Sequence, residues 1–446
     1  MGSSEDIMKC KIVKFGGSSL ADAKQFVKVA NIIKSDEQRR YVVPSAPGKR
    51  FSEDIKVTDM LYQCWQLAHD NEDFSPVLFG IKERYNGIIQ ELGIDLSLEE
   101  EFERIAEGLV AEEYSRDFMA SRGEYFCGKV LAKYLGFSFV DAAEVVFFNS
   151  DGSLNYEKTY PTMASRLSEL ENAVIPGFYG SNPDHTIKVF KRGGSDISGA
   201  IVASAMKADL YENWTDVDGF LMVDPRMVNN PKIIRQLTYK EMRELSYMGA
   251  TVLQEDSIIP VRRAGIAINI KNTNNPSAPG TLIVNDDAAP LEDSTITGIA
   301  GKKGFKVIAV EKEMMNDEVG FGRKVLSVLE KHGVSFEHIP TGVDTMNVVF
   351  QSNTPDKEYK KMLQEIREAV HPDKITLESS LALIAVVGRG MKGNVGVTAK
   401  ISSALAKTGV NIKMLDQSYG EITVIVGVAD EDLITAIRAI YEAFEQ

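Results

Sequence analysis

Alternating apolar and small polar residues predict strands, turns and helices in the first part of the chain. Lys9–Phe15 predicts a strand, and the small residues Gly16–Ser19 predict a turn after it. Apolar residues at helical spacing then predict a helix over about Ala21–Ile33. A second strand over Arg40–Pro44 enters another turn of small residues, Ser45–Gly48.

The same order of strand, turn and helix returns later in the chain. Thr186–Lys191 predicts a strand, Arg192–Asp196 a turn and Ile197–Met206 a helix. Such alternation predicts an α/β fold, a three-layer sandwich whose mostly parallel central sheet carries helices on both faces. Ligands bind beyond the carboxyl ends of the strands in such folds, so we expect the three turns to lie there.

The last third of the chain repeats itself at a constant offset. Six residues of the first copy recur in the second: Val310, Gly320, Lys324, Leu329, Gly333 and Val334 match Val386, Gly396, Lys400, Leu405, Gly409 and Val410. Each copy predicts a βαββαβ unit of the ferredoxin-like type. A Pro/Asn/Gly-rich stretch and an acidic linker precede the copies, so we expect a large domain over 8–285 and two small ones over 294–375 and 376–446.

Composition excludes several classes of protein. The net charge of −14 argues against a nucleic-acid-binding surface, and no apolar run is long enough to predict a membrane span. Cys10, Cys64 and Cys127 form no CxxC pair, and the five histidines have no ligand spacing. We therefore expect a cytoplasmic protein with reduced thiols and without a metal held by its own side chains. The short polar N-terminus is not expected to be a signal peptide.

The first turn has the chemistry of a phosphate site. Lys14 ends a strand, and Gly16, Gly17 and Ser18 let backbone N–H groups approach an anion at the start of a helix. The spacing is not that of a Walker A motif. A strand–helix turn with a surface lysine is the alternative interpretation.

The turn before the third helix is a second cradle of this kind. Gly193, Gly194 and Ser195 supply small residues, and the planar fork of Arg192 suits a carboxylate. Asp196 could orient Lys14 through an ion pair, cap the helix, or do both.

Three further polar motifs are candidates. Ser121–Glu124 is expected to precede a helix, where Glu124 is either a partner of the helix dipole or a ligand for an ammonium group. Trp214–Phe220 follows a strand predicted over Asp209–Asn213, and Asp224–Arg226 lies downstream. The last two are either polar turns or parts of a nucleotide site.

These motifs in this order resemble the amino acid kinase fold and specifically the aspartate kinases, and the repeats resemble ACT domains. The resemblance rests on Lys14–Ser19, Val42–Ala46, Arg122–Glu124, Arg192–Asp196, Trp214–Gly219 and Asp224–Arg226. It implies transfer of the γ-phosphoryl group of MgATP to the side-chain carboxylate of L-aspartate, the first step of lysine, threonine and methionine biosynthesis. A carboxylate is already ionised at neutral pH, so this chemistry needs no general base.

The resemblance also implies roles for individual residues. Lys14 would stabilise the transferring group and Asp196 would position Lys14. Aspartate would be held by Ser45, Thr58, Arg122, Glu124 and Arg192, and the nucleotide by Lys14, Gly16, Gly17, Ser18, Gly193, Gly194, Ser195, Thr215, Asp216, Asp224 and Arg226. An effector amino acid would be held by Met315, Glu318, Gly320, Phe321, Gly322 and Glu337.

Lysine or threonine is the expected effector, and the negative charge of Glu318 and Glu337 favours lysine. Open sheet edges of the repeats predict a homodimer or a dimer of dimers through them. Three positions depart from the family pattern: Thr251 and Gln254 replace a usual lysine and histidine, and Lys191 replaces a frequent glycine.

Two alternatives stay open. The chain could be another amino acid kinase, with a glutamate-type substrate, or an amino-acid sensor with weak catalysis. Its length is not expected to accommodate a fused dehydrogenase.

Overall fold

The computed structural model describes residues 10–191, 193–250, 253, 255–288, 295–351 and 356–445. These residues form two compact units. The first lies within Met1–Phe220, Ile233–Tyr239 and Thr251–Ala288, and the second within Leu221–Lys232, Lys240–Ala250 and Ala289–Gln446. No helix among the described residues is long and apolar enough to cross a membrane.

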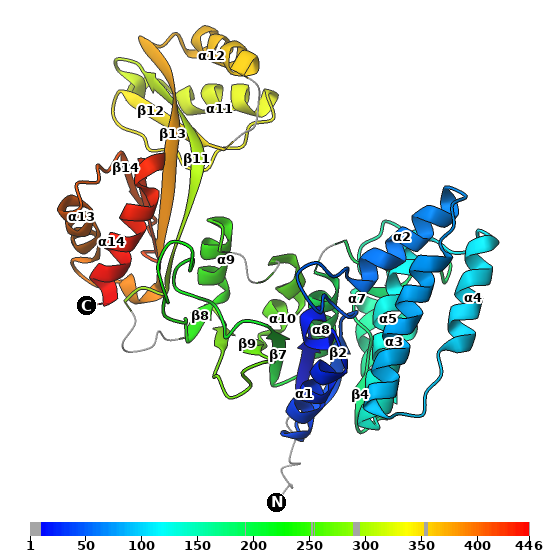
Figure 1. Ribbon diagram of the computed structural model, residues 1–446. Coiled ribbons are helices and arrows are strands. Elements are labelled where there is room, and N and C mark those ends of the chain that lie inside the picture. The colour runs from blue at the N-terminus through cyan, green and yellow to red at the C-terminus, as the bar shows by residue number, and fades with distance from the viewer. Residues whose placement is uncertain are drawn as a thin grey trace, which may run out of the picture. The chain divides into compact units, whose positions relative to one another are not determined.

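An eight-stranded sheet forms the centre of the first unit (Figure 1). Its strands lie in the order β3, β4, β2, β1, β7, β9, β10 and β8, and only the pair β9–β10 is antiparallel. The strands are β1 (Lys11–Phe15), β2 (Arg39–Pro44), β3 (Ser138–Phe139), β4 (Ala173–Val174), β7 (Leu210–Thr215), β8 (Gln236–Thr238), β9 (Ala267–Asn272) and β10 (Thr281–Val284).

Helices cover both faces of this sheet, which confirms the predicted α/β class. The helices are α1 (Ala23–Lys34), α2 (Val57–His69), α3 (Ser75–Leu92), α4 (Glu99–Val110), α5 (Arg116–Leu135), α6 (Ala142–Val145), α7 (Tyr156–Ser168), α8 (Gly194–Ala205) and α10 (Ile259–Ala264), with short 3₁₀ turns η1 (Gly17–Leu20) and η2 (Glu255–Ile258). Side chains alternate between the faces of a strand. Val13 and Phe15 of β1 therefore join the core with α1, α3 and α5, whereas Lys14 points toward α8.

The strand predicted before the Arg192 turn is present as β6 (Ile187–Val189), but its expected place in the parallel sheet is wrong. Strand β6 pairs antiparallel with β5 (Tyr179–Ser181) in a separate two-stranded sheet. The backbone amide of Asn182 donates to the carbonyl of Thr186 at 2.8 Å and closes a hairpin turn. The Pro183–Asp184 pair is a turn signal that favours such a hairpin.

The prediction that Ser121–Glu124 precedes a helix is also wrong, because this segment lies inside α5. The helix begins earlier, where Ser115 Oγ accepts a hydrogen bond from the amide of Phe118 at 3.1 Å. Gly123 is tolerated in the helix because α5 approaches another chain segment closely. A Cβ atom added to Gly123 would lie 2.8 Å from the Cβ atom of Ala46.

The second unit is built on one antiparallel sheet in the order β12, β11, β13, β15 and β14 (Figure 1). The strands are β11 (Gly298–Glu311), β12 (Thr345–Phe350), β13 (Lys374–Val387), β14 (Met414–Gln417) and β15 (Thr423–Ala429). The helices are α9 (Tyr239–Tyr247), most of which belongs to this unit, α11 (Phe321–Lys331), α12 (Asp356–Val370), α13 (Val397–Lys407) and α14 (Leu433–Glu445), with 3₁₀ turns η3 (Met315–Asp317), η4 (Arg389–Met391) and η5 (Asp430–Asp432).

The predicted tandem repeat is visible in this unit. Gly320 precedes α11 with φ of 83°, and Gly396 precedes α13 with φ of 94°. These are left-handed conformations that glycine adopts without strain. The long strands β11 and β13 pair along their length, so a single sheet carries both copies. Because β13 begins at Lys374, the expected junction between residues 375 and 376 falls within this strand.

We expect Gly123→Ala to lower the melting temperature, although alanine is the better helix former by about 1 kcal/mol. The added methyl group would overlap Ala46, and overpacking typically costs about 1–3 kcal/mol. Gly87→Ala in α3 is the matched control, because no atom lies within 4 Å of the added Cβ atom. Thermal unfolding should show the control stabilised. A stabilised Gly123→Ala variant would contradict the close packing of α5.

Candidate active site

Lys14 lies at the centre of the site, in β1, and is only 7% exposed. Its Nζ atom is 2.6 Å from Asp196 Oδ1. Asn213, which is opposite Lys14 in the register of β1 and β7, donates its side-chain amide to the same oxygen at 2.8 Å. Sequence reasoning missed Asn213, because only the strand register brings it beside Lys14. The ion pair shows that Lys14 is not the surface lysine of the alternative interpretation.

Asp196 is presented by the first turn of α8. The N-cap of this helix is Gly193, with φ of 56° and no side-chain cap, so the alternative in which Asp196 caps the helix is wrong. Tyr211 donates its hydroxyl to the carbonyl of Asp196 at 3.1 Å. Ser195 is buried and, like Gly194, packs against the segment after β4. Arg192 lies outside the described residues.

The turns after β1 and β2 touch each other through their backbones. The amide of Gly48 donates to the carbonyl of Gly17 at 2.8 Å, and the amide of Gly16 donates to the carbonyl of Trp214 at 3.0 Å. A Cβ atom on Gly17 would lie 2.8 Å from the carbonyl oxygen of Ala46. Glycine is therefore required by this contact, and the turn stays close to the ammonium group of Lys14. Ser18 is exposed beside it.

Glu124 is a buried carboxyl group on α5 with one oxygen that no described residue bonds. Burial raises its pKa to about 8, against the lowering effects of the Ala46 amide and the charge of Lys14. Glu124 is 5% exposed, and its Oε2 atom has no hydrogen-bond partner. An unpaired buried oxygen of this kind is costly, so the arrangement suits a cationic ligand group.

Ser45 and Thr58, two further predicted substrate residues, flank the same turn. The amide of Ser45 donates to the carbonyl of Phe15 at 3.0 Å, and the amide of Val57 donates to that of Pro47 at 3.2 Å. Both side chains are half-buried. The structure thus places these hydroxyl residues at the two ends of one loop that begins beside β1.

Arg122 differs from the other predicted substrate residues, because its contacts are those of packing. Its guanidinium group lies over the rings of Phe118 and Tyr125 at 4.4 and 4.3 Å. Its Nη2 atom donates to Ser121 Oγ at 2.9 Å. Arg122 therefore packs on the face of α5 that carries Phe118 and Tyr125, whereas Glu124, two residues further on, lies on another face of the helix.

The predicted nucleotide residues belong to both units. In the first unit, Thr215 Oγ1 donates to Asp216 Oδ1 at 3.2 Å, and Asp216 is exposed. In the second unit, Arg226 pairs with Asp224 at 2.5 Å and lowers the pKa of that carboxyl group. The side chain of Arg226 is 87% exposed. Thr251 and Gln254 lie outside the described residues, and Lys191 is exposed.

The predicted effector residues lie in the first repeat. Met315 and Phe321 are buried, and Gly320 and Gly322 lie at the start of α11. Glu318 pairs with Lys312 at 2.5 Å and with Lys324 at 2.6 Å, and these two hydrogen bonds lower its pKa to about 2.

Glu337 has a different environment from Glu318. It accepts a hydrogen bond from the hydroxyl group of Tyr247 in α9. Two lysines therefore already neutralise Glu318, whereas a neutral hydroxyl group meets Glu337. Among the described residues, no cluster of three or more histidine, cysteine, aspartate or glutamate side chains could hold a metal ion.

Comparison with known proteins identifies the family. Residues 9–272 match the amino acid kinase family, and residues 384–444 match an ACT domain. Aspartokinase 3 of Bacillus subtilis (strain 168) is 40% identical over 460 residues, which cover 97% of this chain and 98% of that protein. The chain belongs to the aspartokinase family. The predicted aspartate kinase resemblance is thereby confirmed.

Two solved aspartokinases extend this result. The aspartate kinase of Clostridium acetobutylicum is 50% identical, with a TM-score of 0.88 over 98% of this chain and 100% of that chain. Aspartokinase III of E. coli is 23% identical, with a TM-score of 0.70 over 98% of this chain and 100% of that chain, and shares the fold. The E. coli enzyme was solved with aspartate and ADP, and with lysine and aspartate.

The raised pKa of Glu124 predicts how stability depends on pH. The folded state keeps the proton up to about pH 8, whereas the unfolded chain loses it near pH 4.5, so through this group stability falls as pH rises between these values. We expect the melting temperature of Glu124→Gln, measured relative to that of the wild type, to rise as the pH increases from 5 to 8. Glu103→Gln on the exposed side of α4 is the control and should show no such trend. Parallel curves for the wild type and Glu124→Gln would contradict the burial argument.

Proposed function

We propose that the Lys14 site transfers the γ-phosphoryl group of MgATP to the side-chain carboxylate of L-aspartate. The observation that carries this assignment is the buried contact of Lys14 and Asn213 with Asp196, beside the two glycine turns. Phosphoryl transfer depends on positioning and on stabilising negative charge. Lys14 supplies a fixed positive charge where negative charge develops, and Asp196 and Asn213 hold it in place.

The groups around Glu124 are proposed to select aspartate. The free oxygen of Glu124 accepts the ammonium group of the substrate, and Ser45 and Thr58 donate their hydroxyls to its carboxylates. Arg192 pairs with the α-carboxylate through its forked guanidinium. Binding of the ammonium group favours the ionised form of Glu124, so aspartate binding at neutral pH releases a proton.

The carboxyl end of β7 is proposed to hold the nucleotide. Thr215 ends this strand, and Asp216 follows it. Mg²⁺ is commonly bound by one or two carboxylates together with substrate phosphates, so it would enter this site together with ATP. The ADP and aspartate bound by the E. coli relative agree with this assignment.

The experiment that tests the assignment is a coupled assay of ATP consumption with aspartate, and with glutamate as the alternative substrate. We expect aspartate to be preferred, and Lys14→Ala to lower kcat by about 100-fold or more, the scale of losing one fixed electrostatic donor. Lys11→Ala is the matched control, because Lys11 lies on the same strand but pairs with Asp36 at 2.6 Å. A Lys14→Ala variant with half the wild-type kcat would refute the role of Lys14.

The repeats over 294–375 and 376–446 are proposed to be ACT domains that bind an inhibiting amino acid, with lysine preferred over threonine. A helix N-terminus such as that of α11 favours the carboxylate of a free amino acid. Glu337 supplies a negative charge for the ammonium group of the ligand. Glu318 contributes less to the preference for lysine than the sequence indicated, because two lysines already pair with it.

The same repeats are proposed to join two copies of the chain into a homodimer, alone or within a dimer of dimers. Val319 and Val395 occupy equivalent positions in the two copies and are 97% and 98% exposed. Exposed apolar side chains that recur at equivalent positions fit a symmetric contact with a second chain.

We expect lysine to inhibit the wild-type enzyme cooperatively, and Glu337→Ala to raise the half-inhibitory lysine concentration by about 10-fold or more. Uninhibited kcat should stay unchanged. Lysine and threonine titrations of activity, with sedimentation of the same samples, test both points, and Glu313→Ala on the exposed side of the same repeat is the control. A monomer indifferent to both amino acids would refute the regulatory proposal and leave the kinase assignment intact.

A further inference from the structure

Arg84 is a buried cation on α3 that no sequence motif marks. It is 7% exposed, and its guanidinium group donates to three backbone carbonyls, two in the loop over residues 45–58 and one at the end of η1. Nη1 donates to Ile55 at 3.0 Å, and Nη2 donates to Ala21 at 3.2 Å and to Gly48. Asp54 Oδ2 lies 3.5 Å from Nη1.

The three carbonyls belong to the segments that form the substrate side of the site. Gly48 is in the turn after β2 and bonds Gly17 in the turn after β1. Ala21 ends the short turn η1 that follows Gly17. Ile55 closes the loop that leads into α2 and Thr58. Arg84 thus connects the turn over Gly16–Ser18, the predicted phosphate site, to the loop whose two ends carry Ser45 and Thr58.

Asp54 extends this anchor to the middle of the loop. Its carboxylate accepts hydrogen bonds from the backbone amide of Arg50 at 2.9 Å and from the guanidinium group of Arg50 at 2.7 and 2.9 Å. These bonds to Arg50 hold the pKa of Asp54 well below its usual range. The loop over residues 45–58 therefore carries a buried carboxylate, that of Asp54, which pairs with Arg50 within the loop and with Arg84 on α3.

We propose that Arg84 is a positioning residue that fixes the loop over residues 45–58 relative to Lys14 and thereby sets the affinity for aspartate. The inference rests on the proposed function, in which Ser45 and Thr58 bind that substrate. The guanidinium group donates to these carbonyls from two nitrogen atoms fixed in one plane, whereas a lysine ammonium carries its three donors on a single nitrogen atom and cannot reproduce this fork. Errors of about 1 Å in substrate placement can cost about 100-fold in rate.

The test is the kinetics of Arg84→Lys, which keeps the positive charge beside Asp54. We expect the KM for aspartate to rise by about 10-fold or more and kcat to fall. The KM for ATP should rise less than the KM for aspartate, because two of the three carbonyls that Arg84 bonds, those of Gly48 and Ile55, lie in the loop over residues 45–58, and only that of Ala21 follows the turn at Gly17. A larger rise in the KM for aspartate than in the KM for ATP distinguishes a misplaced loop from a general loss of folding, which would affect both values.

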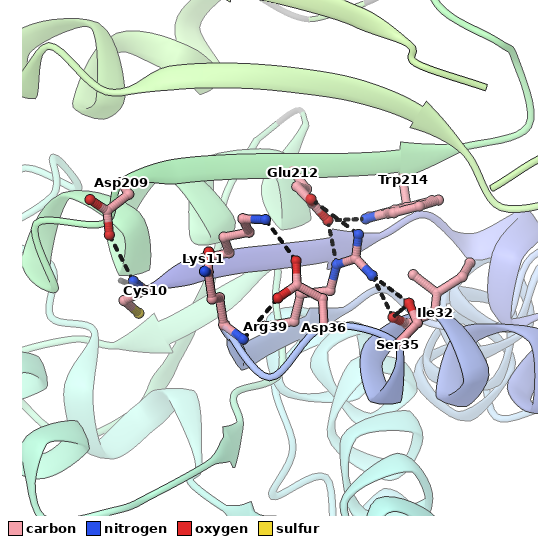
Figure 2. Close-up of polar contacts among 10 residues, drawn as sticks. Cys10, Lys11, Ile32, Ser35, Asp36, Arg39, Asp209, Glu212 and Trp214 are labelled. Carbon is pink, nitrogen blue, oxygen red and sulfur yellow. Dashed lines mark hydrogen bonds and ion pairs between the residues drawn. The ribbon is translucent and has the colours of Figure 1, made fainter. Parts of the chain in front are cut away.

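Arg39→Lys is the matched control. The side chain of Arg39 is 11% exposed, and Figure 2 shows it bonded to Glu212, at 2.8 Å, and to the carbonyl of Ile32 and the hydroxyl of Ser35. It begins β2 and therefore lies at the opposite end of that strand from Ser45. We expect Arg39→Lys to lower the melting temperature and to leave the KM for aspartate within about 2-fold of the wild-type value.

Limited trypsin digestion gives an independent readout. Lys49, Arg50 and Lys56 are exposed in the loop, and cleavage after them should be faster in Arg84→Lys than in the wild type or in Arg39→Lys. Mass spectrometry of the fragments identifies the sites. If Arg84→Lys does not fold, Asp54→Asn decides the question through the same two measurements, with an expected rise of at least about 3-fold in the KM for aspartate.

An aspartate KM within about 2-fold of wild type in the folded Arg84→Lys variant, or an equal rise in Arg39→Lys, would overturn the inference. An unchanged KM in Asp54→Asn would do so where Arg84→Lys does not fold. A wild-type chain that phosphorylates no aspartate would instead contradict the proposed function, and the cleavage rates would then decide whether Arg84 anchors the loop.

Discussion

The ion pair between Lys14 and Asp196 is the interaction on which the site in the first unit depends. Removing two charges from water costs several kcal/mol per ion, and their attraction repays this only when further hydrogen bonds complete the geometry. Asn213 and Tyr211 provide these bonds from β7. Because the partners come from β1, β7 and α8, the pair holds the helix against the sheet and keeps the ammonium group of Lys14 beside Gly16.

Sequence reasoning predicted the parts of the fold and site that follow from local residue order. Lys14, the glycine turns and the tandem repeat have such signals. Asn213 had none, because its place depends on the register of two strands distant in sequence. Ser121–Glu124 was expected to precede a helix but lies inside α5, where close packing of Gly123 against Ala46 offsets the low helix propensity of glycine. Arg84 was missed because its partners are backbone carbonyls, which leave no pattern in the sequence.

The two glutamates of the predicted effector site show a second limit of sequence reasoning, because residue type alone does not tell which charges are already paired. Glu318 and Glu337 are the same residue type within one predicted ligand site, yet their partners differ. Lys312 and Lys324 hold Glu318 ionised well below neutral pH, and Glu337 meets the hydroxyl of Tyr247. A ligand ammonium group would have to displace two cations at Glu318 but one neutral donor at Glu337. The lysine preference proposed above therefore depends mainly on Glu337.

The shared strands of the second unit have a consequence for how the repeats unfold. Strands β11 and β13 each contribute one part to the core of the first repeat and another part to the core of the second. Opening either repeat alone would leave half of both strands without hydrogen-bond partners. Two structurally similar copies thus lose the thermodynamic independence that separate modules have, and a loss of order in one copy is transmitted to the other through continuous backbone.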